Sequence, residues 1–211
     1  MLSLLGLGRA KGRPAFRGVV YNVGDGKGVL KYQDLNDILE EDPDMIGLLE
    51  VADRGDVIQR WLQNHPGWAF FNGDGSQGAA KTGVLYRTKV KVTSKKSHRL
   101  TPRFKLPKGA GPENAPPKVA NRLRFKWYGK RSHFIVCHQY ATVHNRMYYA
   151  TRFITALTQV VVTRLGSVVV VGDFNQERHQ NPLRLLTKVV RSWSQVGKTR
   201  DSREIDGTGV S

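Results

Sequence analysis

The 211-residue sequence predicts an α/β layered fold with a mixed β-sheet. Short apolar runs typical of buried strands alternate along the chain with segments whose apolar residues recur at helical spacing. Neighbouring strand-like runs joined by glycine-rich or polar turns predict antiparallel hairpins at the flanks. A chain of this length is most simply one domain, and it is long enough to bury a substantial core.

The N-terminal part of the chain is expected to contain a leader, a strand, a helix and a second strand. Residues 1–15 are partly basic and predict a flexible leader. A strand at residues 17–22 follows, and then a helix that Pro43 closes. The next apolar run ends at Glu50. These elements begin a domain that we place at residues 16–211.

A second helix and a hairpin are expected next. Asp56 is a candidate cap for a helix whose apolar residues lie on one face. Residues 68–71 and 82–87 predict two strands joined by a glycine-rich loop. Residues 101–118 hold five of the nine prolines and predict a long surface loop inside the domain.

The remaining elements alternate again between strand and helix. Strands are expected over residues 123–128 and 133–140, and a helix over residues 146–165. Four consecutive valines then predict a buried strand that leads into Asp173. A last strand is expected over residues 207–211.

Charge is the strongest compositional signal. Thirty-four Lys and Arg residues against seventeen Asp and Glu residues give a net charge of +17. Such an excess favours binding to polyanions through counterion release. A merely soluble basic surface is the alternative, but residues 95–131 hold twelve basic residues and one acid, Glu113. This clustering favours nucleic acid as the partner.

Other classes of protein fit the sequence poorly. The longest apolar stretches are far shorter than the roughly 20 residues that span a bilayer, so no transmembrane segment is expected. Basic residues follow the apolar N-terminal run, whereas a secretory signal has them first, so an intracellular (cytoplasmic) protein is expected. The single Cys137 lies in an apolar strand and is expected to be a core residue.

Four apolar strand-like runs end in side chains that can handle a metal or a phosphate. These are Asn22, Glu50, His138 and Asp173, with Asn175 two residues beyond the last. Buried strands of one sheet place their ends along a common edge, so these side chains are expected to meet there. Such a set suits metal-assisted hydrolysis of a phosphoester.

Several of these residues could instead have a purely structural role, without binding a metal or a phosphate. Asn22 could equally cap the glycine-rich loop that follows it, and Glu50 could belong to a buried ion pair. Asp173 and Asn175 could hold the backbone of a turn.

His133 and His138 are five residues apart on a strand and therefore face opposite sides, which disfavours joint metal binding.

Taken in order, these motifs resemble the endonuclease/exonuclease/phosphatase superfamily, whose fold is that of pancreatic DNase. The resemblance runs over residues 16–211. It implies a four-layer α/β sandwich of two packed mixed β-sheets flanked by helices. The matching features are Asn22, Glu50, the strand at 82–87, His138 with the helix that carries Arg152, and the tetrapeptide Gly172-Asp173-Phe174-Asn175.

The resemblance implies a divalent-metal-dependent phosphodiester hydrolase, with DNA as the expected substrate. Glu50 and Asn22 would hold Mg²⁺ or Mn²⁺. Asp173 would orient or deprotonate the attacking water, and Asn175 would fix the phosphate or that carboxylate. His138 would contact the phosphate, by stabilising the transition state or by acting as an acid.

Further features of the resemblance concern the C-terminal part and the partner. Asp206 in Arg203-Glu-Ile-Asp206 matches more weakly and would support the catalytic centre. The family's Ser-Asp-His segment does not occur in the sequence, so a non-catalytic nucleic-acid-binding remnant is an alternative, as is a phosphatase or phospholipid phosphodiesterase. Arg122, Arg124 and Arg146 would contact the nucleic-acid backbone. The protein is expected to be a monomer.

Overall fold

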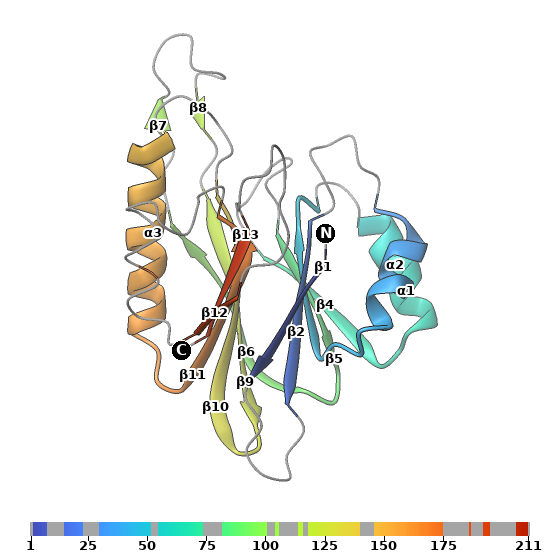
Figure 1. Ribbon diagram of the computed structural model, residues 1–211. Coiled ribbons are helices and arrows are strands. Elements are labelled where there is room, and N and C mark those ends of the chain that lie inside the picture. The colour runs from blue at the N-terminus through green and yellow to red at the C-terminus, as the bar shows by residue number, and fades with distance from the viewer. Residues whose placement is uncertain are drawn as a thin grey trace.

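A computed structural model of the protein shows two mixed β-sheets packed face to face between helices (Figure 1). The four-layer α/β sandwich predicted for the sequence is therefore confirmed. The structure describes residues 2–7, 15–22, 30–51, 55–73, 82–100, 104–105, 114–115, 118–139, 146–174, 186, 192–194 and 206–210.

The first sheet has five strands in the order β1-β2-β3-β5-β4. Its central strands β2 and β3 are parallel, and the other pairs are antiparallel. Helices α1 and α2 lie on its outer side, at the right of Figure 1. The bounds are β1 Leu2–Leu7, β2 Phe16–Asn22, α1 Tyr32–Leu39, β3 Met45–Leu49, α2 Gly55–Asn64, β4 Trp68–Asn72 and β5 Gly83–Arg87.

The second sheet has six strands in the order β12-β13-β11-β10-β9-β6. Strands β10 and β11 are parallel and joined through helix α3, which packs on the outer face of the sheet. Strands β7 and β8 form a separate two-stranded ladder. The bounds are β6 Lys91–Arg99, β7 Phe104–Lys105, β8 Asn114–Ala115, β9 Val119–Trp127, β10 Lys130–His138, α3 Arg146–Val162, β11 Ser167–Asp173, β12 Ser192–Ser194 and β13 Asp206–Val210.

Several elements differ from their predicted form. Within the expected leader, β1 pairs antiparallel with β2 along its whole length. Asp56 lies inside the first turn of α2, where a carboxylate favours the helix dipole, rather than before that turn. The expected loop at residues 101–118 contains the β7–β8 ladder. Strand β6 was not predicted, because its mostly polar sequence lacks an apolar run.

Alternation along the strands sorts the side chains into three apolar layers. Between the sheets lies a cluster that includes Phe16, Phe125 and Phe134. Two further clusters lie beneath the helices on the outer faces. Gly47 permits the close approach of the sheets, because a Cβ there would lie 2.9 Å from a methyl carbon of Val136.

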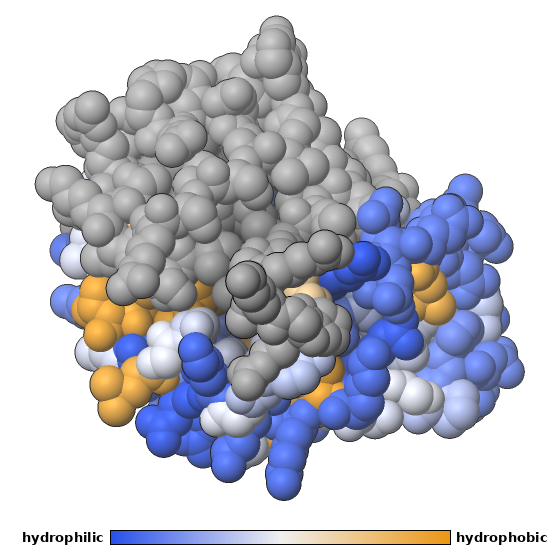
Figure 2. Space-filling view, turned by 60° about the horizontal axis from the view of Figure 1, so that its bottom comes forward, coloured by the Kyte–Doolittle hydropathy of each residue, from blue (hydrophilic) through white to orange (hydrophobic). Residues whose placement is uncertain are grey.

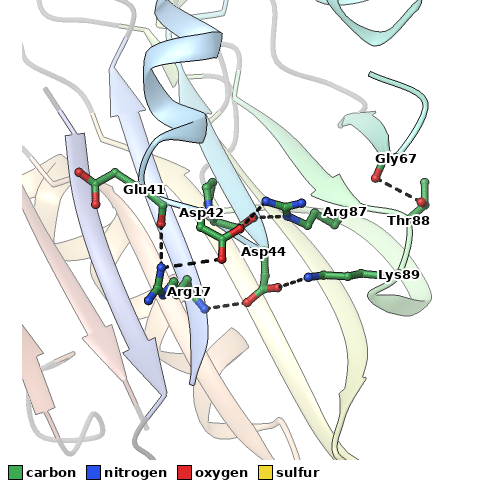
Figure 3. Close-up of polar contacts among 9 residues, drawn as sticks. Arg17, Glu41, Asp42, Asp44, Gly67, Arg87, Thr88 and Lys89 are labelled. Atoms are coloured by element: carbon green, nitrogen blue, oxygen red, sulfur yellow. Dashed lines mark hydrogen bonds and ion pairs between the residues drawn. The ribbon is translucent and has the colours of Figure 1, made fainter. Parts of the chain in front are cut away.

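Charged residues tie the first sheet together at the end away from the carboxyl ends of β2 and β3 (Figure 3). The backbone N–H of Arg17 donates to the buried Asp44 carboxylate at 3.0 Å, and Lys89 lies 3.7 Å from the same carboxylate. Arg87 donates to Asp42 at 2.6 Å. Hydrophilic residues predominate in the described part of this end (Figure 2). A cavity of about 480 Å³ here is lined by Ala15, Arg17, Asp42, Asp44, Lys89, Lys126, Trp127 and Tyr128.

Candidate active site and family

Side chains from both sheets meet at the opposite end, where β2, β3, β10 and β11 finish. The Nε2 atom of His138 lies 3.4 Å from a Glu50 carboxylate oxygen and 3.8 Å from an Asp173 carboxylate oxygen. The amide of Asn22 donates to the same Glu50 oxygen at 3.4 Å. The structure therefore brings together four of the five residues predicted to meet at this rim.

Strand alternation explains how three of these side chains reach the space between the sheets. Asn22, His138 and Asp173 each lie two residues after a member of the inter-sheet cluster on the same strand. Their side chains therefore point to the same side of the sheet as that cluster. His138 and Asp173 are also aligned partners in the parallel β10–β11 pair. Both side chains are about nine-tenths buried.

Glu50 reaches the cluster in another way. Ile46 and Leu48 pack beneath the helices, so a regular continuation of β3 would turn Glu50 toward the helices as well. Its φ of 57° is left-handed, a conformation that is costly for a residue with a Cβ. Because this turn breaks the alternation, the carboxylate can point toward His138 instead.

Lys118 joins this cluster, although sequence reasoning counted it only among the basic residues of the 95–131 segment. It directly precedes β9 and is 4% exposed. Burial lowers the pKa of Lys118 to about 8, while the negative charges of Asp173 and Glu50 act in the opposite direction. The ammonium group therefore compensates part of the carboxylate charge. Its position after a proline-rich stretch gave no signal of burial.

The imidazole of His138 is buried and electrically neutral near pH 7. Burial, and then repulsion by Lys118, lowers the pKa of His138 to about 3. Neither ring nitrogen has a hydrogen-bond partner among the described residues. A neutral ring offers a lone pair to a metal ion or a proton acceptor to a substrate.

The remaining predicted site residues are placed only in part. Asp206 begins β13 and is the aligned partner of Asp173, so its backbone lies at the rim. Arg146 begins α3. The side chains of these two residues are not described, and Asn175 lies outside the described residues. Their roles stay predictions.

Arg122 and Arg124 lie apart from this centre. On β9 the inter-sheet cluster takes Leu123 and Phe125, so the two arginines point to the outer face. His133 behaves as expected and lies away from His138, with its Nε2 atom 3.3 Å from the carbonyl oxygen of Leu165. Cys137 is a buried core residue, and burial raises the pKa of its thiol.

The cluster has the composition of a metal site. One donor atom each from Glu50, His138 and Asp173 lies within 4.8 Å of the others. These two carboxylates and the imidazole nitrogen would together hold a divalent cation. Two carboxylates against one ammonium leave these described groups with a net negative charge, which favours a divalent cation.

Comparison with known protein families gives a match over most of the chain. The family model described as "Endonuclease/Exonuclease/phosphatase family" matches residues 19–207. A search of curated protein sequences found no match. Within the described residues, no helix is long and apolar enough to cross a membrane.

Solved structures with the same fold include three with stated activities or ligands. The human Nocturnin catalytic domain with bound sulfate is 18% identical, with 99% of this chain and 85% of that chain covered and a TM-score of 0.67. TDP2 from D. rerio complexed with a single-strand DNA product is 15% identical, with 92% and 82% covered and a TM-score of 0.68. The mannosyl-6-phosphatase Bt3783 of Bacteroides thetaiotaomicron is 17% identical, with 92% and 84% covered and a TM-score of 0.65.

At these identities the solved structures establish the fold, whereas the family model matches the sequence over most of its length. The members of this family are metal-dependent phosphodiesterases and phosphatases. The chain belongs to the endonuclease/exonuclease/phosphatase family.

Proposed function

We propose that the protein is a divalent-metal-dependent phosphodiester hydrolase that acts on nucleic acid, with DNA as the substrate. The observation that carries the proposal is the meeting of Glu50, His138 and Asp173 at one buried rim, with Asn22 and Lys118 beside them. The net charge of +17 supports a polyanionic substrate. The single-strand DNA product bound to the similar TDP2 supports DNA.

Glu50 and Asp173 fit a hard divalent cation, Mg²⁺ or Mn²⁺, because both offer carboxylate oxygens. Asn22 orients Glu50 through its amide, as its 3.4 Å hydrogen bond indicates. When bound, the ion would supply Lewis-acid stabilisation of charge that develops on phosphate oxygens.

The other groups act on the phosphate and on the attacking water. Lys118 attracts the phosphate and stabilises the charge on its oxygens. Asp173 accepts a proton from water, or orients it, because its carboxylate is held beside a neutral imidazole. His138 contacts the phosphate or the leaving oxygen. Asn175 and Asp206 are proposed to support Asp173 from its own loop and from β13.

Nicking of supercoiled plasmid in the presence of Mg²⁺ tests this proposal. Glu50→Ala and Asp173→Ala are each expected to slow nicking by at least roughly 100-fold. Glu40→Ala is the matched control, because Glu40 is exposed at the end of α1 and its loss changes the net charge equally. Nicking that survives both rim substitutions would contradict the proposed mechanism.

A phosphatase is the second candidate, supported by the similarity to the mannosyl-6-phosphatase. The same three variants should be compared on a phosphate monoester. Turnover of the monoester without nicking, lost in Glu50→Ala, would favour the phosphatase over the nuclease. Binding of DNA without turnover of either substrate would support a non-catalytic protein. The monomeric state and the intracellular location stay predictions.

A further inference from the structure

The outer face of the six-stranded sheet carries a group of cations between β9, the edge strand β6 and the end of α3. We call this group the outer cationic cluster, and define it as Lys96, Arg122, Arg124 and Arg164. The sheet register places Lys96 directly opposite Arg122. Arg164 follows α3, and its charge acts on Arg122.

Arg122 is the centre of the outer cationic cluster. It is 8% exposed, and its Nε atom has no hydrogen-bond partner among the described residues. A buried charged donor without an acceptor is costly, and such groups are ordinarily paired. Burial lowers the pKa of Arg122, and repulsion by Arg164 and Arg124 adds to that effect.

The neighbouring cations are not neutralised either. Arg124 donates its Nε–H to the Thr93 hydroxyl at 3.1 Å, and Arg164 donates its own to the carbonyl oxygen of Val160 at 3.0 Å. Both acceptors are neutral. Among the described residues, no acid forms an ion pair with any member of the cluster.

The positive charge of the cluster also affects the pKa of two neighbouring histidines. The pKa values of His98 and His133 are both lowered to about 4, by burial first. Repulsion by Arg122 and Arg164 contributes to both shifts. The two rings are therefore neutral near pH 7. These histidines therefore add no further positive charge to the cluster.

We propose that the outer cationic cluster is a second phosphate-binding site, separate from the active site. Guanidinium groups match the geometry of phosphate oxygens, and Arg122 presents a buried donor that a phosphate would satisfy. The site lies on the opposite face from His138. Along the strand, Arg122 is aligned with Ile135, three residues or about 10 Å before His138.

The position suggests the source of the phosphate. Strand β6 is the edge of its sheet, so a nucleic-acid strand leaving the rim can pass over that edge to the outer face. This assignment to nucleic acid rests on the proposed function. The phosphate site itself rests only on the cluster, and a small phosphorylated molecule offers the same chemistry.

Titration with inorganic phosphate in EDTA, by calorimetry at fixed ionic strength, tests the site. Arg122→Gln is expected to weaken phosphate binding by at least roughly tenfold. Arg60→Gln is the matched control. It removes the same charge from the exposed surface of α2 and should bind phosphate like the wild type. Equal binding by Arg122→Gln and the wild type would overturn the proposal.

A second pair of variants keeps the test decisive if Arg122→Gln does not fold. Lys96→Gln and Arg164→Gln change more exposed members of the cluster, and each is expected to weaken phosphate binding by about threefold. Wild-type affinity in both would refute the site. Folded Arg122→Gln should also lack the phosphate-dependent rise in melting temperature that the wild type shows.

Two oligonucleotides, one short and one several times longer, distinguish the sources. If the site holds the nucleic-acid backbone, Arg122→Gln weakens binding of the long one more than that of the short one. If the site takes a small molecule, only inorganic phosphate binding is lost. Absence of plasmid nicking would contradict the proposed function and leave these binding results unaffected.

Discussion

Replacing Gly172 by alanine should disrupt the rim through the backbone. Gly172 precedes Asp173 in β11 and is aligned with Cys137 of the parallel strand β10. A Cβ at Gly172 would lie 2.0 Å from the carbonyl oxygen of Cys137 and 2.9 Å from its carbonyl carbon. No rotamer change relieves a clash with backbone atoms, so β10 and β11 must separate where His138 and Asp173 face each other.

The cost of this change follows from the atoms involved. Overpacked cores typically lose 1–3 kcal/mol, and a clash with backbone belongs at the upper end, about 3 kcal/mol. With a urea m-value of about 2 kcal/mol/M, the unfolding midpoint of Gly172→Ala should fall by roughly 1.5 M. Hydrolysis should fall as well, because the distance between His138 and Asp173 is set by the same strand pair.

Gly67→Ala is the matched control for this substitution. A Cβ at Gly67 would have no atom within 4 Å, so the change in stability should stay within about 0.5 kcal/mol. Urea unfolding followed by circular dichroism measures both variants against the wild type. A Gly172→Ala protein as stable as the control would refute the close approach of β10 and β11 at this position.

Three further predictions address metal, pH and salt. Mg²⁺ should raise the melting temperature of the wild type, and Glu50→Gln should lose most of this rise, because the substitution removes a carboxylate ligand. The pKa of His133 is lowered in the folded state from 6.5 to about 4, so its contribution to stability is present above pH 6.5 and is lost as pH falls toward 4. The wild type should lose unfolding free energy between pH 7 and pH 4.5, and His133→Leu should reduce this loss by up to about 3 kcal/mol. Urea unfolding at the two pH values measures it. An equal loss in the variant and the wild type would contradict the lowered pKa of His133. DNA affinity should fall steeply with salt in fluorescence anisotropy, and a flat response would argue for a small phosphoester substrate.

The rim could be predicted from sequence because it depends on features that a single strand displays. An apolar run that ends in a polar residue is visible locally, and parallel strands place their carboxyl ends at one edge. Asn22, His138 and Asp173 follow directly, since each keeps the parity of its strand. Their meeting required no information about loops.

The direction of the Glu50 side chain and the burial of Lys118 could not be predicted from the strand pattern. A left-handed backbone at a glutamate has no sequence signature, although the turn decides which face receives the carboxylate. The burial of Lys118 depends on the pairing of β9 with its neighbours. Strand β6 was missed for a related reason, because an edge strand with mostly exposed polar residues has no apolar periodicity.

The basic residues have two different roles, and the amino-acid composition alone does not distinguish them. Lys118 lies near two carboxylates, so its charge acts within the rim. Arg122 and Arg124 face other cations, because the alternation of β9 sends them to the side opposite Leu123 and Phe125. The net charge of +17 predicts that a polyanion binds. The alternation of side chains along β9 places Arg122 and Arg124 on the outer face, where they can bind phosphates of the polyanion outside the active site. Because this binding involves no metal ion, Arg122→Gln should weaken phosphate binding even when no metal is present.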